Sequence, residues 1–166
     1  MEKAKQTLTK AGVELPLKLT MKLPPPAYAR RSGELIRLML AMIDVEVEII
    51  PVEWPIWLEQ VFKQKDYDLT IISHTEPLDI GIYAREGYYF NFEHDGFKQI
   101  MQEINLSNNE MVKKQLYQEA QTLLAEQAVN VFLFQLPKVA IWRKGLHGMW
   151  ANQPVQANIV YDAHWE

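Results

Sequence analysis

A group of chemically active side chains lies in the sequence SHTEPLDIGIY at residues 73–83, directly after an apolar run. It contains a serine, a histidine, a threonine and two carboxylates, namely Ser73, His74, Thr75, Glu76 and Asp79. Histidine and carboxylate groups act as general acids and bases, and they also ligate zinc or nickel. The segment is therefore a candidate for a catalytic cluster, a metal site, a ligand-binding loop or a plain polar turn.

The spacing of these residues favours neither catalysis nor metal binding. His74, Glu76 and Asp79 match no motif with a defined mechanism, such as two histidines four residues apart on a helix. The sequence lacks cysteine, a nucleophile elbow, a phosphate-binding loop and a dinucleotide-binding glycine motif. We expect no catalytic residue, no bound metal and no cofactor. One alternative is a small α/β hydrolase-like enzyme that uses His74 with Glu76 or Asp79, and another is a structural or partner-binding domain.

The composition is that of one soluble domain. The chain has 166 residues, of which 48% are apolar and 23% charged, and its formal net charge is −4. No basic stripe is present, so we expect no nucleic-acid partner. No apolar run approaches the roughly 18 residues of a membrane span. The start, MEKAKQTLTKAG, lacks the apolar centre of a signal peptide, so we expect no export signal within the chain itself.

Alternating strands and helices are predicted for residues 1–73. The sequences LKLTMKL and VEVEIIPVE alternate apolar and polar residues with the period of a strand. The expected elements are a helix at 2–12, a strand at 17–23, a helix at 30–43, a strand at 45–53, a helix at 55–64 and a strand at 67–73. Such a βαβαβ order implies parallel strands joined by right-handed crossovers. The helix at 30–43 is apolar around much of its circumference, so we expect neighbours on more than one side.

The rest of the chain has a different pattern. We expect a short helix at 79–85 that Asp79 caps, and another helix at 96–105. Ser107 and Glu110 have the spacing of a capping box and predict the start of a long helix that ends near Gln127. The sequence VNVFLFQL at 129–136 predicts a buried strand, and 139–145 predicts a further one. We expect residues 1–166 to form a single domain.

The predicted topology places a candidate binding site at one edge of the sheet. Ligands of open parallel sheets bind beyond the carboxyl ends of the strands. Those ends are followed by Tyr28, by Trp54 and Trp57, and by the polar loop that begins at Ser73. Aromatic side chains beside a few polar groups suit a small-molecule site. The alternative is that both tryptophans are core residues.

The order of motifs resembles a known family. Three stretches carry the likeness: AKQTLTKAGVELPLKLTM, VEVEIIPVEWPIWLEQVFKQKDYDLTIIS and YQEAQTLLAEQAVNVFLFQLPKVAIWRKGLHGMW. Together they resemble the C-terminal lobe of the extracellular solute-binding proteins (family 5) that serve peptide, nickel and dipeptide ABC importers. After the Tyr67-Asp68 strand, the chain has Ser73-His74-Thr75-Glu76-Pro77 where the family commonly has Gly-Trp and a Gly/Asp-rich turn.

This resemblance implies a periplasmic-binding-protein-like (type II) lobe, a three-layer α/β/α fold with a mostly parallel or mixed sheet. It implies a solute such as an oligopeptide or dipeptide, bound between two lobes and facing Ser73, His74, Thr75, Glu76 and Asp79. The implied partners are a missing N-terminal lobe and a membrane permease, and the parent protein would be periplasmic or otherwise extracytoplasmic. We therefore expect weak solute binding by this chain alone and an exposed apolar patch on its rim.

Overall fold

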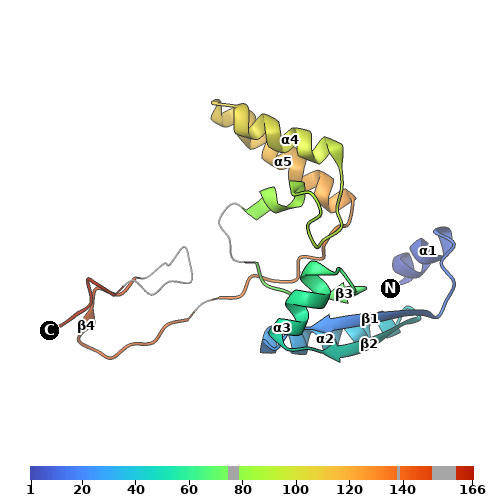
Figure 1. Cartoon of the computed structure of the whole chain (residues 1–166), viewed down its shortest axis with the longest axis horizontal. Helices are drawn as coiled ribbons and strands as arrows, with labels where there is room; N and C mark the ends of the chain where they lie inside the picture. Colours follow the sequence, from blue (N-terminus) through green and yellow to red (C-terminus); the bar gives the residue numbers. More distant parts are fainter. Residues whose placement is uncertain (75–78, 138, 151–159) are drawn as a thin grey trace. The chain divides into compact units, whose positions relative to one another are not determined.

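The computed structural model describes residues 1–74, 79–137, 139–150 and 160–166 (Figure 1). These residues divide into two compact units. The first unit comprises Met1–Ser73 with Gly87–Asn91, and the second comprises His74–Glu86 with Phe92–Glu166. Within the described ranges, no helix is both long and apolar enough to cross a lipid bilayer.

A parallel sheet organises the first unit. Strands β1 (Leu17–Leu23), β2 (Val45–Pro51) and β3 (Leu69–Thr70) lie in the order β2-β1-β3. Strand β1 pairs with β2 from Leu17 opposite Val45 through Leu23 opposite Pro51, and β3 pairs with β1 at Met21 and Lys22. The predicted βαβαβ order and parallel pairing are confirmed, although β3 is shorter than the predicted strand at 67–73.

Helix α2 (Ala27–Ala41) covers one face of this sheet. The helix approaches the sheet closely because two of its contact residues are small. Ala29 is fully buried, and a Cβ atom at Gly33 would collide with the Cδ1 atom of Leu23. Helix α1 (Glu2–Lys10) adds Leu8 to the same cluster and is followed by Gly12 at φ +70°, a conformation typical of the glycine that ends a helix. This cluster, centred on Met21 and Leu23, is the core of the first unit.

One expectation about α2 is wrong for the described residues. The helix was expected to have neighbours on more than one side, yet four large apolar side chains remain more than half exposed. They are Leu35, Leu38, Met39 and Met42. The helix packs on the sheet through its small residues and through Ile36, Leu40 and Ile43, so this second apolar face points away from the core.

The opposite face of the sheet is covered at one end by a short helix and a π-helix. These are α3 (Trp54–Ile56), with Pro55 in its first turn, and η1 (Trp57–Lys63), and together they occupy the helix predicted at 55–64. The Trp57 indole N–H donates to Thr70 Oγ1 at 3.0 Å, and Thr70 is the register partner of Lys22. Because successive residues of a strand point to opposite faces, Trp57 lies opposite the side that holds Met21 and Leu23. The first unit therefore has the three layers α2, sheet and η1.

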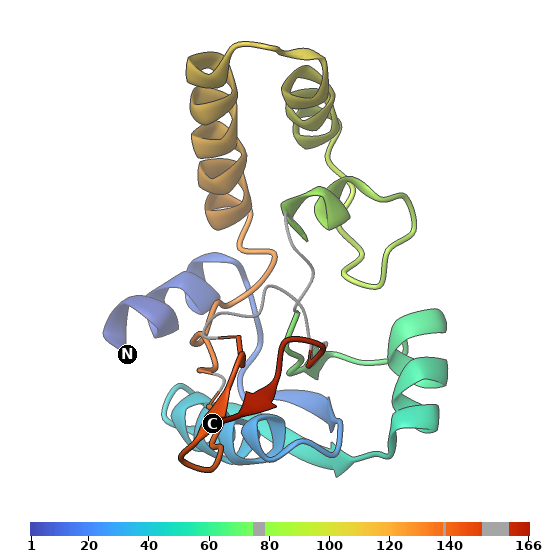
Figure 2. The ribbon, with the colours of Figure 1, turned by 90° about the vertical axis from the view of Figure 1, so that its left-hand side faces the viewer.

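The second unit is mainly helical. It contains the 3₁₀ helix η2 (Asp79–Ala84), the helices α4 (Asp95–Leu106) and α5 (Glu110–Glu126), and the strand pair β4 (Leu146–His147) and β5 (His164–Trp165). Helices α4 and α5 lie side by side in both views (Figures 1 and 2). Their buried side chains are Phe97, Ile100, Ile104, Ala120 and Leu124.

The predicted capping box is wrong in its residues. Helix α5 starts at Glu110, and its N-cap is Asn109, whose Oδ1 accepts from the N–H groups of Met111 and Val112 at 2.9 and 3.4 Å. Ser107 Oγ instead accepts from the N–H of Asn109. Asparagine caps helices as well as serine does, so the sequence offered two caps and the chain uses the later one.

The two strands predicted after α5 are also wrong. Residues 129–136 and the described part of 139–145 have no strand pairing, and Val131, Phe132 and Ile141 are 82%, 76% and 94% exposed. A strand needs a neighbouring strand to satisfy its backbone groups, and the described residues supply none here. We call residues 129–136 the 129–136 segment. Its sequence has the apolar pattern of a buried strand, but most of its apolar side chains are exposed.

Candidate functional site

The carboxyl ends of the strands meet in the first unit, as predicted. Tyr28 follows β1 in the first turn of α2, and Ser73 follows β3 as the last residue of its segment. The Ser73 N–H donates to the Tyr28 hydroxyl oxygen at 3.0 Å. This hydrogen bond joins two of the three predicted site segments and places a phenol and a serine side by side at the strand ends, which we call the rim.

The two tryptophans that follow β2 have different environments. Trp57 is 4% exposed, and it donates to Thr70, whose hydroxyl donates in turn to the Lys22 carbonyl at 2.7 Å. Trp54 is 39% exposed, and its ring meets the Trp57 ring edge-on at a centroid distance of 5.8 Å. Trp57 is therefore held in place by its contact with β3, and it packs against a neighbour whose ring is partly exposed to solvent.

Trp57 belongs to a buried aromatic cluster of the first unit. Trp57, Val61 and Tyr89 are buried together with Val52, and Phe62 packs tilted against Tyr89 with ring centroids 5.3 Å apart. The Tyr67 hydroxyl donates to the Tyr89 carbonyl at 2.7 Å, and burial raises the pKa of this phenol. Within the aromatic run at residues 88–92, Tyr89 is buried, and Tyr88 and Phe90 are partly buried against the same cluster.

Asp68 links the start of β3 to the middle of β1, on the polar face of the sheet. Its Oδ2 atom accepts from the backbone N–H and from the hydroxyl of Thr20, both at 2.7 Å. These two hydrogen bonds lower the pKa of the Asp68 carboxyl, the backbone bond contributing most, and partial burial opposes them. Nearby, the Lys22 ammonium is nearly buried and binds Asp66 Oδ2 at 2.7 Å. Asp66 and Asp68 both precede β3, and the sequence did not identify either as a residue that holds this segment against β1.

The remaining predicted site residues fall differently. Thr75 and Glu76 lie outside the described residues. His74 and Asp79 belong to the second unit, where Asp79 is the first residue of η2. Across the described ranges, no group of three or more histidine, aspartate and glutamate side chains could hold a metal ion.

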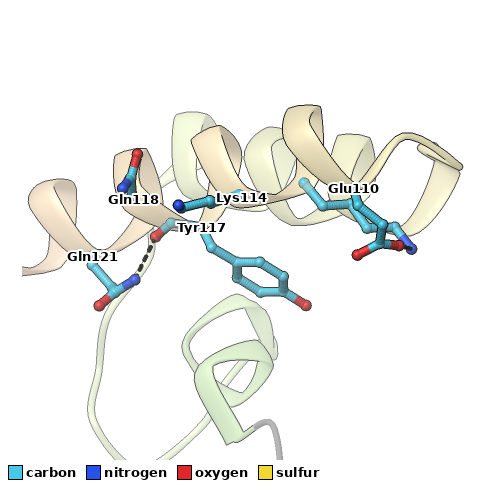
Figure 3. Close-up of a pocket in the computed structure, with 6 residues that line it drawn as sticks. Glu110, Lys114, Tyr117, Gln118 and Gln121 are labelled. Carbon is cyan, nitrogen blue, oxygen red and sulfur yellow. Dashed lines mark hydrogen bonds and ion pairs between the residues drawn. The ribbon is translucent and has the colours of Figure 1, made fainter.

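A hollow on the surface of the second unit offers no comparable site. It is lined by residues of α5 alone, and several of their side chains point away from one another (Figure 3). The lining residues are Glu110, Lys113, Lys114, Tyr117, Gln118 and Gln121. Gln121 donates to the Tyr117 carbonyl at 2.9 Å within the helix. Among the described residues, the lining of the hollow comes from one helix, whereas binding sites usually draw polar groups together from several elements.

Sequence comparison alone identifies no relative of this chain. No family model matches the sequence, and no curated protein sequence matches it either.

Solved structures do match, and two of those named here cover 99% of the chain. The oligopeptide-binding protein AppA from Bacillus subtilis, in complex with a nonapeptide, has a TM-score of 0.79 at 18% identity and covers 99% of this chain. A dipeptide binding protein from Pseudoalteromonas sp. SM9913, in complex with Met-Leu, has a TM-score of 0.74 at 18% identity and also covers 99%. A nickel ABC transporter structure from Bacillus halodurans has a TM-score of 0.63 at 23% identity and covers 77%.

These similarities show the fold. The chain has the periplasmic-binding-protein fold of type II, α/β with a parallel sheet, as the sequence resemblance implied. The chain spans only part of the proteins it matches, namely 37% of the Bacillus subtilis chain, 35% of the Pseudoalteromonas chain and 30% of the Bacillus halodurans chain.

Proposed function

We propose that this chain is part of the substrate-binding component of an ABC-type importer and that its rim forms one wall of a solute-binding cleft. The observation that carries the proposal is the fold match over 99% of the chain to two binding proteins solved with bound peptides. The similar structures named above are described as binding or transport proteins, so they give the hydrolase alternative no support. A binding role requires no catalytic group at the rim.

The rim supplies the chemistry that a peptide-like solute needs. The exposed Trp54 ring offers an apolar face for a side chain, while the Tyr28 and Ser73 hydroxyls offer hydrogen bonds to a peptide backbone. The buried Trp57 ring packs edge-on against the Trp54 ring and so helps to fix its position. We keep His74, Thr75, Glu76 and Asp79 as ligand-facing residues, as the family resemblance implies. The proposed solute is an oligopeptide, a dipeptide or a related molecule.

Exposed apolar surface supports a companion lobe. Trp54, Ile56, Leu58 and Phe62 on α3 and η1 are 39% to 48% exposed, which agrees with the apolar patch expected beside the rim. The 129–136 segment exposes further large side chains, including Phe132 and Phe134. Exposed apolar patches often mark interaction sites, and each of these two regions offers one. We propose that residues 1–166 serve as one lobe and that a second lobe closes the cleft. The parent protein would work outside the cytoplasm and deliver its solute to a permease in the membrane.

One wall alone should bind weakly. Burial of apolar surface contributes about 25 cal/mol per Å², and a solute held between two lobes draws that contribution from both. A solute on an open rim therefore loses a large part of its affinity. Calorimetry that measured submicromolar binding of a peptide to this chain alone would contradict the one-wall proposal.

The rim can be tested by NMR titration of the full chain with dipeptides and short oligopeptides at millimolar concentration. We expect shifts at the Trp54 indole N–H and at the Ser73 amide, and Trp54→Ala should weaken the response several-fold. Leu106→Ala is the control because Leu106 is an exposed apolar side chain on α4, in the other unit, and should change little. No response at the rim, or an equal loss in both variants, would refute the assignment.

A further inference from the structure

The exposed side of α2 carries an apolar stripe that the proposed solute site does not use. Leu35, Leu38, Met39 and Met42 are 63%, 56%, 67% and 54% exposed. Their spacing of three, four and seven residues places them together along one side of the helix. We call these four residues the α2 stripe.

The stripe has the form of a helix-packing surface. Apolar residues at this spacing are those that two α-helices interdigitate when they pack along their length. Methionine side chains adapt readily to such a partner surface. The polar pairs of α2 leave the stripe free, because Arg37 binds Glu34 within the helix and Arg30 binds Glu53 after β2. The surface thus fits a second helix with the same apolar spacing.

The charges of α2 indicate which helix that is. A helix favours acidic residues in its first turn and basic residues in its last, and α2 has neither. Instead Arg30 and Arg31 lie near its beginning, and Asp44 follows its end with a carboxylate that is 56% exposed. Antiparallel packing against a copy of itself would bring Arg31 to the partner's carbonyl-bearing end and to Asp44. The basic start of each helix would then face the acidic end of the other, so the charges of the two copies would be complementary.

We propose that α2 packs antiparallel against α2 of a second copy of this chain, about a twofold axis between Leu38 and Met39. This arrangement sets Leu38 against Met39 of the partner copy and Leu35 against Met42. A twofold contact of this kind is self-complementary, because the same patch serves both copies. Asp44 already accepts from Lys5 at 2.8 Å within its own chain. Because its carboxylate is still 56% exposed, it can also receive Arg31 of the other copy.

The expected association is weak. A stable interface buries about 800 Å² on each partner, and four side chains provide only part of that area. The dimer should therefore form at high protein concentration and dissociate on dilution. Sedimentation equilibrium of the full chain should detect it, and Met39→Glu should raise the dissociation constant at least about tenfold by placing like charges at the axis.

Cysteine cross-linking tests the geometry directly, since the chain has no native cysteine. Leu38→Cys should form a disulfide-linked dimer under mild oxidation because the two copies meet at the axis. Leu35→Cys should not, because residue 35 lies about 10 Å along the helix from its symmetry mate, beyond disulfide reach. Leu106→Cys, at a site 82% exposed on α4, controls for random collision.

A charge reversal provides the second test. Arg31→Glu should weaken the dimer several-fold, whereas Arg30→Glu, the same change on the neighbouring residue, should not. A chain that stays monomeric at every concentration would overturn the proposal. So would equal cross-linking at positions 35, 38 and 106. Association that survives Met39→Glu but is lost in Phe132→Glu would assign self-association to the 129–136 segment and also overturn it.

Discussion

Strand β1 and the 129–136 segment make an instructive pair. Both are short, rich in apolar residues and predicted as strands, one reading LKLTMKL and the other VNVFLFQL. In the structure β1 pairs along its whole length with β2, and Leu23 is fully buried. The 129–136 segment has no strand pairing, and Val131 is 82% exposed.

The difference lies in the neighbours and not in the segments themselves. Strand β1 has β2 and β3 on its two edges, α2 on one face and η1 on the other. Its backbone pairs with β2 along the whole strand and with β3 at Met21 and Lys22, and its last three side chains are buried within the first unit. An apolar pattern shows that a segment gains stability from a partner, but it does not show that the described residues contain that partner.

The largest contrast should come from the same substitution made in both regions. Leu23→Ala should lower the free energy of unfolding by about 2–5 kcal/mol because it leaves a cavity beneath α2. Leu133→Ala, at a side chain that is 43% exposed, should change it by less than about 0.5 kcal/mol. Denaturant unfolding measures both values. Similar costs at the two positions would mean that the 129–136 segment is packed in solution, which would contradict the comparison.

Acid should weaken the first unit through Asp68. Its pKa is lower in the folded chain than the usual value of about 3.9, so the ionised form stabilises the fold. That stabilisation is fully present above about pH 4 and is lost as the pH falls through the folded-state pKa. Asp68→Asn should therefore cost about 1 kcal/mol at neutral pH and flatten the pH dependence below pH 4.

Native-state hydrogen exchange of the β1 amides would measure this effect in the sheet. Glu48→Asn is a suitable control because Glu48 is an exposed carboxylate on the adjacent strand β2. If the pH dependence persists in Asp68→Asn, other carboxylates account for the acid sensitivity.

The smallest effect should be confined to the second unit. Asn109→Ala should destabilise the start of α5 by about 1 kcal/mol, since it removes the acceptor for the N–H groups of Met111 and Val112. Ser107→Ala should cost less because Ser107 does not cap the helix. Exchange rates of α5 amides report the change, and β1 amides should be unaffected. A larger cost at Ser107 would restore the original capping-box prediction.

Much of the first unit was predictable because its signals are local. Period-two alternation located β1 and β2, and the alternation of strands and helices over residues 1–73 predicted the parallel order. That order also gathered Tyr28, Trp54 and Ser73 at one edge. The unequal roles of Trp54 and Trp57 were not predictable, because they depend on how closely η1 packs against Thr70.

The sequence alone therefore determined the succession of elements in the first unit and the residue types at the strand ends, since both follow from neighbouring residues. Only the tertiary structure decided which apolar surfaces are enclosed. Asp68 bonding to Thr20, the exposed α2 stripe and the unpaired 129–136 segment all depend on contacts between distant residues, or on their lack within the described chain. Burial is a property of packed partners, and no periodicity within one segment encodes whether those partners are present.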